Sequence, residues 1–201
     1  MAVVEFLEDA AELAESISSA MTAADTPTPP SAGGNWMPVT VVNHTQFLLT
    51  PADSYFDSGR FQVAPSLIAP FKAFTFSVSA TDNSILTGVT GAMAYTFSPK
   101  QGVTCRLGVG FSNPEIGGYK ANVAFDADMN QAENSNPVLQ PIQDFTVGTY
   151  NGNTTSIIQT TSANFTGVDK TGAPLTIDFL GSSSPGAHPV VTIVQQIVPG
   201  S

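Results

Sequence analysis

From residue 36 onward, short stretches in which apolar and polar residues alternate are separated by turn-forming residues at roughly ten-residue spacing. The alternation is strict in the segment FTFSV at residues 74–78, so we expect one face of that strand to be buried and the other to meet water. Strands are expected at residues 39–43, 46–50, 61–64, 73–80, 91–97, 105–111, 121–125, 156–160, 175–180 and 190–198. Many short strands with frequent turns predict a mainly β fold, a sandwich or a barrel, and we expect a β-sandwich.

Residues 1–21 follow a helical period instead. Their apolar residues recur every three or four positions and fall on one stripe of a helix, namely Val3, Phe6, Leu7, Ala10, Ala14, Ile17 and Met21. The acidic residues lie off that stripe, and they are Glu5, Glu8, Asp9, Glu12 and Glu15. The segment contains no Gly or Pro and is rich in good helix formers. We therefore predict an amphipathic N-terminal helix that flanks the sandwich.

Two roles are open to this helix, and they are compatible in a protein that switches. A surface helix can dock its apolar stripe on a neighbouring sheet. Roughly twenty helical residues also reach about 30 Å, which is the thickness of the hydrocarbon core of a bilayer. A single helix cannot carry its carboxylates through lipid at reasonable cost. An oligomer could turn them toward a shared aqueous lumen, where rings of carboxylates attract cations.

A linker separates the helix from the sandwich. Residues 22–35 contain three prolines, which remove backbone donors, and the pair Gly33 and Gly34, which provides a flexible joint. The chain is thus divided into a helix at 1–21, this linker, a sandwich at 36–180 and a strand-like extension at 181–201. Residues 126–137 are the candidate for a short second helix.

Composition narrows the partners of the protein. The 201 residues suffice for one well-cored domain and carry 6 Lys and Arg against 16 Asp and Glu, a formal charge of −10. Phosphate backbones and anionic lipid surfaces would repel such a chain, so we expect no nucleic-acid partner. The N-terminus lacks the basic and uninterrupted apolar regions of a signal peptide. Either the chain stays inside the cell until release, or Met1 has replaced a leader, and we expect a soluble, released protein.

Motifs for catalysis or metal binding fail when tested. The two histidines, His44 and His188, do not stand in a metal-ligand spacing and have no local support for a catalytic triad. Residues 126–137 open like a calcium loop, but Gln131 stands where Gly is needed and Pro137 where Glu is needed. The lone Cys105 is expected to be a small buried apolar residue. We therefore expect no enzyme, no metal and no cofactor.

Three blocks resemble the actinoporins, the pore-forming cytolysins of sea anemones with relatives in other organisms. They are residues 52–59 (ADSYFDSG), 87–95 (TGVTGAMAY) and 107–114 (LGVGFSNP), in the order of the family and at close to its spacing. Residues 166–179 look like the closing hairpin of the family. The resemblance implies a β-sandwich flanked by two helices. It also implies that the sandwich binds a phosphocholine-bearing lipid, typically sphingomyelin, before N-terminal helices insert and line a cation-permeable pore.

The resemblance also implies a headgroup site. The residues that match the lipid contacts of the family are Ser58, Met93, Ser112 and Pro114, with Tyr119 as the one nearby aromatic candidate. The basic residue that the family has before the first serine is Asp57 here, although Arg60 lies close by and could substitute for it. The aromatic cluster that surrounds choline in the family has no clear counterpart. We infer that the lipid or receptor preference has changed.

If the resemblance holds, five positions have predictable environments. Gly59 and Gly91 should lie in tight turns or at close backbone approaches, because a side chain would not be tolerated there. The apolar residues Phe76, Val109 and Phe111 should be buried in the sandwich.

These observations predict a pore-forming toxin that acts on a target-cell membrane. It would bind a phosphocholine headgroup or a membrane receptor, form a homo-oligomer in the membrane and insert the stripe from Val3 to Ile17, with Glu5, Glu8, Glu12 and Glu15 lining the pore. One alternative is a non-lytic, lectin-like or lipid-binding sandwich, which would bind without causing leakage. Another is a structural subunit, such as a shell or adhesion component, whose helix packs permanently on a neighbouring chain.

Overall fold

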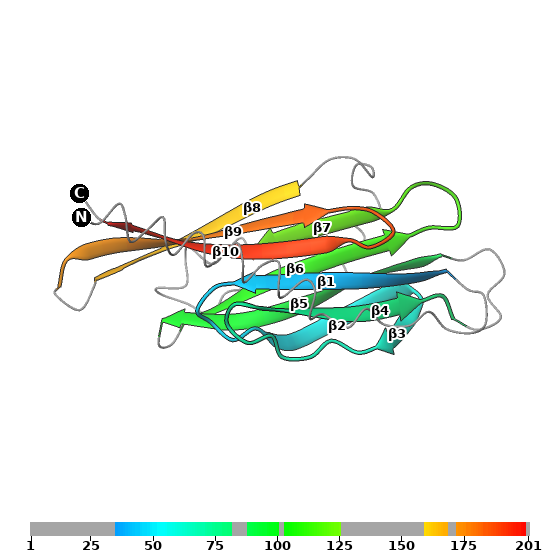
Figure 1. Cartoon of the computed structure of the whole chain (residues 1–201), viewed down its shortest axis with the longest axis horizontal. Helices are drawn as coiled ribbons and strands as arrows, with labels where there is room; N and C mark the ends of the chain where they lie inside the picture. The colour runs from blue at the N-terminus through cyan, green and yellow to red at the C-terminus, as the bar shows by residue number, and fades with distance from the viewer. Residues whose placement is uncertain (1–34, 82–87, 101–102, 126–158, 169–171, 200–201) are drawn as a thin grey trace.

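Two β-sheets packed through a shared apolar core make up the part of the chain that the structure describes (Figure 1). The computed structural model describes residues 35–81, 88–100, 103–125, 159–168 and 172–199. The six-stranded sheet has the order β3-β4-β1-β10-β9-β8, and the four-stranded sheet has the order β2-β5-β6-β7. The strands are β1 (Trp36–His44), β2 (Thr50–Ser58), β3 (Arg60–Val63), β4 (Lys72–Ser79), β5 (Val89–Lys100), β6 (Val103–Asn113), β7 (Lys120–Phe125), β8 (Gln159–Val168), β9 (Pro174–Ser184) and β10 (Val190–Pro199). The prediction of a mainly β fold with two sheets is confirmed.

Helices are absent from the residues that the structure describes. The predicted helices at 1–21 and 126–137 lie outside those residues. For the same reason, the structure does not test the inserting stripe or the acidic residues assigned to the pore. Within the described ranges, nothing has the length and apolar character of a membrane-spanning helix.

The core forms where the inner faces of the two sheets meet. Val39 and Phe76 enter it from the six-stranded sheet, and Val109 and Phe111 enter it from the four-stranded sheet, all without exposed surface. The predicted burial of Phe76, Val109 and Phe111 is therefore confirmed. Cys105 is also fully buried, as predicted for a small apolar residue. Alternating residues point to opposite faces of a strand, so each of these strands contributes every second side chain to the core.

The prediction that the polar face of residues 74–78 meets water is wrong. Thr75 is only 5% exposed and Ser77 only 1% exposed. The hydroxyl oxygens of Thr75 and Thr40 on the neighbouring strand lie 2.7 Å apart and form a hydrogen bond. Hydroxyls that bond to one another can be buried, as at Thr75, whereas the Ser77 hydroxyl is buried with no hydrogen-bond partner among the described residues. Alternating polarity therefore does not by itself mark a solvent face.

The strand expected at residues 46–50 is not found as predicted: residues 45–48 form a turn after β1, Leu49 makes an isolated bridge with Ile68, and β2 begins at Thr50. Asn43 organises this turn. Its side-chain Nδ2 donates to the carbonyl oxygens of Phe47 and Ile68 at 2.7 and 3.2 Å, and its Oδ1 accepts from the backbone N–H of Thr45 at 3.0 Å. A buried asparagine that bonds nearby backbone groups competes with strand pairing and favours a turn. The strand that the sequence analysis did not predict is β2, at residues 50–58.

Residues 181–199 belong to the body of the sandwich. The strand β9 continues to Ser184, and β10 lies between β9 and β1 in the six-stranded sheet. The pairing of β10 with β1 is parallel, whereas its pairing with β9 is antiparallel. The predicted strand at 190–198 therefore exists as β10 in the interior of the sheet.

The chain passes from one sheet to the other at Gly59, which joins β2 to β3. Its φ of 99° lies in the left-handed region, and a Cβ there would come within 2.6 Å of the carbonyl oxygen of Ser79. At Gly91, a Cβ would lie 2.9 Å from the carbonyl oxygen of Tyr55. The expectation of a tight turn or close approach at both glycines is confirmed.

Candidate functional site

A row of polar residues crosses the end of the four-stranded sheet. The strand register aligns Ser58 of β2 with Thr90 of β5, Thr90 with Ser112 of β6, and Ser112 with Lys120 of β7. Residues directly opposite one another in paired strands project from the same face. Ser58, Thr90, Ser112 and Lys120, which we call the polar row, therefore share one face of the sheet.

Hydrogen bonds hold the hydroxyls of the polar row in place. The side-chain oxygens of Thr90 and Ser112 lie 2.8 Å apart, and both residues are almost fully buried. The hydroxyl of Ser58 donates to the carbonyl oxygen of Gly88 at 3.0 Å. Ser58 and Lys120 at the two ends of the row are half-buried. The row thus has a rigid centre and more accessible ends.

Because Gly88 has no side chain, the turn after β6 can lie close to the start of β5. A Cβ on Gly88 would lie 2.2 Å from the carbonyl oxygen of Asn113 and 2.5 Å from the Cα of Pro114. Both neighbours are backbone atoms that could not move aside without displacing the turn. This glycine therefore allows Pro114 to lie beside the polar row, because a side chain at position 88 would hold the two segments apart.

The loop between β6 and β7 presents apolar side chains to solvent. Ile116 at its tip is 90% exposed, and Tyr119 is 36% exposed. The side-chain amide of Asn35 donates to a carboxylate oxygen of Glu115 at 2.6 Å and so ties the loop to the chain before β1. Gly117 supports the turn with a φ of 120°. The loop therefore holds an exposed isoleucine on an anchored backbone.

Of the residues assigned to the headgroup site, the structure gathers Ser58, Ser112, Pro114 and Tyr119 at this end of the sheet. Arg60 follows the Gly59 corner, so it begins β3 on the other sheet, where its side chain is exposed. The structure gives the positions of these residues, and their role in lipid binding stays a prediction.

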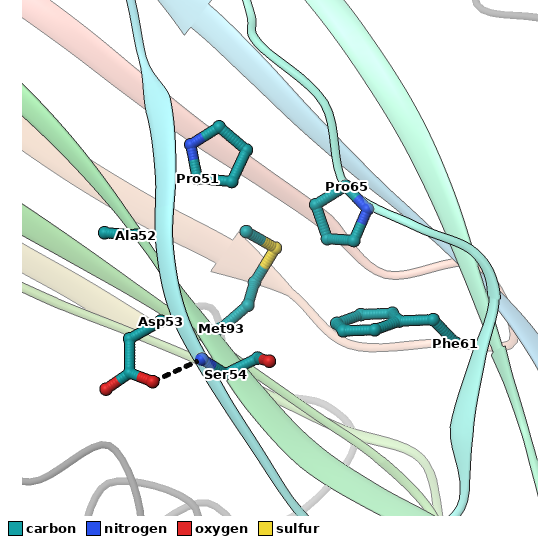
Figure 2. A pocket seen from close by; sticks show the side chains of 7 residues that line it. All are labelled: Pro51, Ala52, Asp53, Ser54, Phe61, Pro65 and Met93. Carbon is teal, nitrogen blue, oxygen red and sulfur yellow. Dashed lines mark hydrogen bonds between the residues drawn. The ribbon is translucent and has the colours of Figure 1, made fainter.

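Met93 lies apart from that group. It is three residues from Thr90 along β5 and therefore projects from the opposite, inner face. Only 1% of it is exposed. Figure 2 shows its side chain between Pro51 and Pro65 in a pocket of about 220 Å³. The residues that line this pocket are Pro51, Ala52, Asp53, Ser54, Phe61, Pro65 and Met93. Binding sites for drug-sized ligands usually span roughly 300–1,000 Å³, so this pocket suits a smaller apolar group.

Titratable side chains at other positions are structural in character. Burial raises the pKa of the Cys105 thiol to about 12, so the thiolate is not populated at neutral pH. Burial lowers the pKa of His44, which keeps its imidazole neutral. His188 forms a hydrogen bond between its Nε2 and the hydroxyl oxygen of Thr40 at 2.7 Å. Among the described residues, no three His, Cys, Asp or Glu side chains gather as a metal site would require.

Four residues at this end of the sheet were missed by the sequence analysis. They are Gly88, Thr90, Ile116 and Lys120. Gly88 and Thr90 lie inside the block at 87–95, but only the register of β5 with β2 and β6 brings them to Ser58 and Ser112. The signal for Ile116 was present, because an apolar residue beside two glycines in a turn is seldom a core residue.

The fold and the site define a two-sheet β protein whose four-stranded sheet ends in a polar row beside an exposed apolar loop tip. No protein-family model matches the chain, and no curated protein sequence matches it. Among solved structures, the chain is similar to that of the lipid binding protein Nakanori, with a TM-score of 0.53 and 13% sequence identity. The likeness covers 82% of this chain and 72% of that chain. At this identity, it shows a shared fold.

Proposed function

We propose that this protein binds lipid membranes through the polar row and the β6–β7 loop. The observation that carries the proposal is the 90% exposed Ile116 on an anchored loop beside that row. An exposed isoleucine at a loop tip contributes no favourable burial free energy in water. Burial of such a side chain in an apolar environment is favourable by about 1.5–3 kcal/mol. The fold shared with a protein described as lipid binding supports the same proposal.

The chemistry of the surrounding residues favours a zwitterionic headgroup, with phosphocholine as the proposed class. The ammonium group of Lys120 can donate to a phosphate, and the ring of the adjacent Tyr119 suits the membrane interface. A formal charge of −10 opposes binding to anionic lipid surfaces. A headgroup without net charge avoids that repulsion. Neither the ligand nor the membrane process requires a catalytic group, so we propose a non-enzymatic protein.

Sedimentation with vesicles of phosphatidylcholine and sphingomyelin tests membrane binding. We expect Ile116→Asp to weaken binding by at least about tenfold, since a carboxylate at the loop tip would have to leave water. The matched control is Leu67→Asp, because Leu67 is an exposed apolar residue, 55% accessible, in the loop before β4. Ile68, the residue after Leu67, pairs with Leu49 near the start of β2, whereas the polar row includes the last residue of β2. Leu67 therefore lies near the opposite end of β2 from the polar row. Equal losses in both variants, or no loss in Ile116→Asp, would contradict the proposal.

We further propose that bound molecules oligomerise and insert residues 2–21, as the amphipathic stripe and the acidic face of that segment suggest. In this view the protein is soluble until it meets its target membrane. The acidic residues would then face an aqueous lumen and favour the passage of cations.

Release of a trapped dye from the same vesicles tests pore formation. We expect the full chain to cause leakage and a chain lacking residues 1–24 to bind without leakage. Thermal unfolding of both chains controls for the integrity of the sandwich. Leakage by the shortened chain would remove the N-terminal segment from the mechanism. Binding without leakage by both chains would leave a non-lytic lipid-binding module.

A further inference from the structure

The pocket around Met93 lies between two strands that belong to different sheets. β2 stands at one end of the four-stranded sheet, and β3 stands at one end of the six-stranded sheet. Pro51 and Ser54 of β2 line one side of the pocket (Figure 2). Phe61 of β3 and Pro65 line the other side. The pocket is therefore on the inner side of the sandwich, away from the polar row on the outer face of the four-stranded sheet.

An irregularity in β2 forms the first side of the pocket. Pro51 and Ser54 are three positions apart in β2, but their partners in β5, Tyr95 and Met93, are only two positions apart. β2 therefore contains one extra residue at this point, which is a β-bulge. Both partners in β5 belong to the core, so Pro51 and Ser54 both face inward. In a regular strand, residues three positions apart would project to opposite faces.

Aromatic contacts fix the second side of the pocket. The ring centroid of Phe61 lies 4.7 Å from that of Phe56 on β2, at an interplanar angle of 83°. It also lies 5.8 Å from the ring centroid of Phe76 on β4, at an angle of 80°. Edge-to-face pairs of this kind contribute about 0.5–1.5 kcal/mol each beyond their buried area. Phe61 is nevertheless half-buried, so part of an immobilised ring faces the pocket.

The pocket presents one hydroxyl and no charge to a ligand. Of the seven described residues that line it, Asp53 is the only charged one. A carboxylate oxygen of Asp53 accepts from the N–H of Ser54 at 2.8 Å, and Figure 2 shows this carboxylate directed away from Met93. The side chain of Ser54 points toward Phe61 in the same view. A charged ligand would lose its hydration here without gaining an opposite charge, so the pocket favours an uncharged one.

We propose that this pocket binds a phenol, meaning an uncharged aromatic ring that carries one hydroxyl. Such a ring can contact Phe61 edge to face, and the sulfur of Met93 favours contact with a ring edge. The hydroxyl of Ser54 can both donate to and accept from the phenol hydroxyl. A volume of about 220 Å³ is below the usual range for drug-sized ligands and suits a single ring.

Titration of the full chain with p-cresol, followed by NMR of the methionine methyl groups and backbone amides, tests this proposal. No lipid is present, so the result is independent of membrane binding. We expect saturable shifts at the Met93 methyl group and the Ser54 amide. Toluene lacks the hydroxyl, and we expect it to bind about fivefold more weakly, the equivalent of one hydrogen bond. Cyclohexanol lacks the aromatic ring and benzoate carries a charge, so both should also bind more weakly than p-cresol.

Ser54→Ala isolates the role of the hydroxyl. We expect it to weaken the binding of p-cresol about fivefold and to leave the binding of toluene unchanged. The matched control is Ser66→Ala, because Ser66 is an exposed serine next to Pro65 that does not line the pocket. Circular dichroism would verify that both variants are folded. Equal effects of the two substitutions on p-cresol would contradict the proposal.

A tyrosine-containing tripeptide distinguishes two sources of the phenol. Binding of p-cresol alone would identify a free small molecule, whereas binding of both compounds at Met93 would also admit a tyrosine side chain. Either result supports a phenol site. Shifts that do not saturate, or that avoid Met93, would overturn the proposal. It would also fail if toluene, cyclohexanol or benzoate bound as tightly as p-cresol.

Discussion

Phe111→Ala is expected to lower the free energy of unfolding by about 4 kcal/mol. Phe111 has no exposed surface, and its ring centroid lies 5.7 Å from that of Phe56 on β2 and 5.7 Å from that of Phe76 on β4. It therefore connects the two sheets at the end of the sandwich that carries the polar row. Truncation would remove its burial and leave a cavity between side chains that cannot collapse fully. Urea unfolding followed by circular dichroism would measure the loss.

The control for this prediction is Ile116→Ala, five residues further along the chain. Ile116 is 90% exposed and contributes little to packing, so we expect a change within about 0.5 kcal/mol. A loss for Phe111→Ala as small as that for Ile116→Ala would show that the core does not extend to Phe111 as described. A small loss for Phe111→Ala with a reduced slope of the urea dependence would indicate a change in two-state behaviour instead.

Gly59→Ala is expected to lower the free energy of unfolding by about 3 kcal/mol, from left-handed strain and steric overlap together. The added Cβ would lie 2.5 Å from a methyl carbon of Val89 and 2.6 Å from the carbonyl oxygen of Ser79. Ser79 belongs to β4 and Val89 to β5, so the overlap occurs where the chain changes sheets. Because Ser58 precedes this corner, the variant should also weaken vesicle binding. Thermal and urea unfolding would measure the stability term.

Gly172→Ala separates the two causes of that loss. Gly172 also has a positive φ, 85°, but a Cβ there would meet no atom within 4 Å. We expect it to cost about 1 kcal/mol, the strain term alone. If both alanine variants lose the same free energy, the close approach at Gly59 is not a real constraint on the fold.

Much of the strand content could be predicted from local pattern. Residues 73–80 and 105–111 show clear apolar spacing, and both became strands of the sandwich. The pattern failed at β2, whose segment TPADSYFDS contains a proline and several polar residues. As an edge strand of the four-stranded sheet, β2 is largely exposed, so it needs no continuous apolar face. The neighbouring segment 46–50 looked apolar enough for a strand, but the hydrogen bonds of Asn43 to Phe47 and Thr45 hold its first part as a turn.

The residues of the candidate site were harder to predict from the sequence than the strands. Ser58 and Ser112 are separated by 54 positions, and they come together only because β5 lies between β2 and β6. Met93 was grouped with them, yet alternation along β5 places it on the inner face. A block of sequence can match a motif while its residues project to opposite sides of one strand. The roles of these residues in lipid binding remain predictions for the vesicle experiments.

The sequence by itself determined the class of fold, the positions of most strands, the burial of residues such as Phe76 and Phe111, and the need for glycine at position 59. These features depend on the alternation, size and backbone freedom of residues close in the chain, which are local properties. Only the tertiary structure decided that β10 lies between β1 and β9 and that the polar row forms. Those features depend on which distant strands pair and in which register, and many pairings are compatible with the same local pattern.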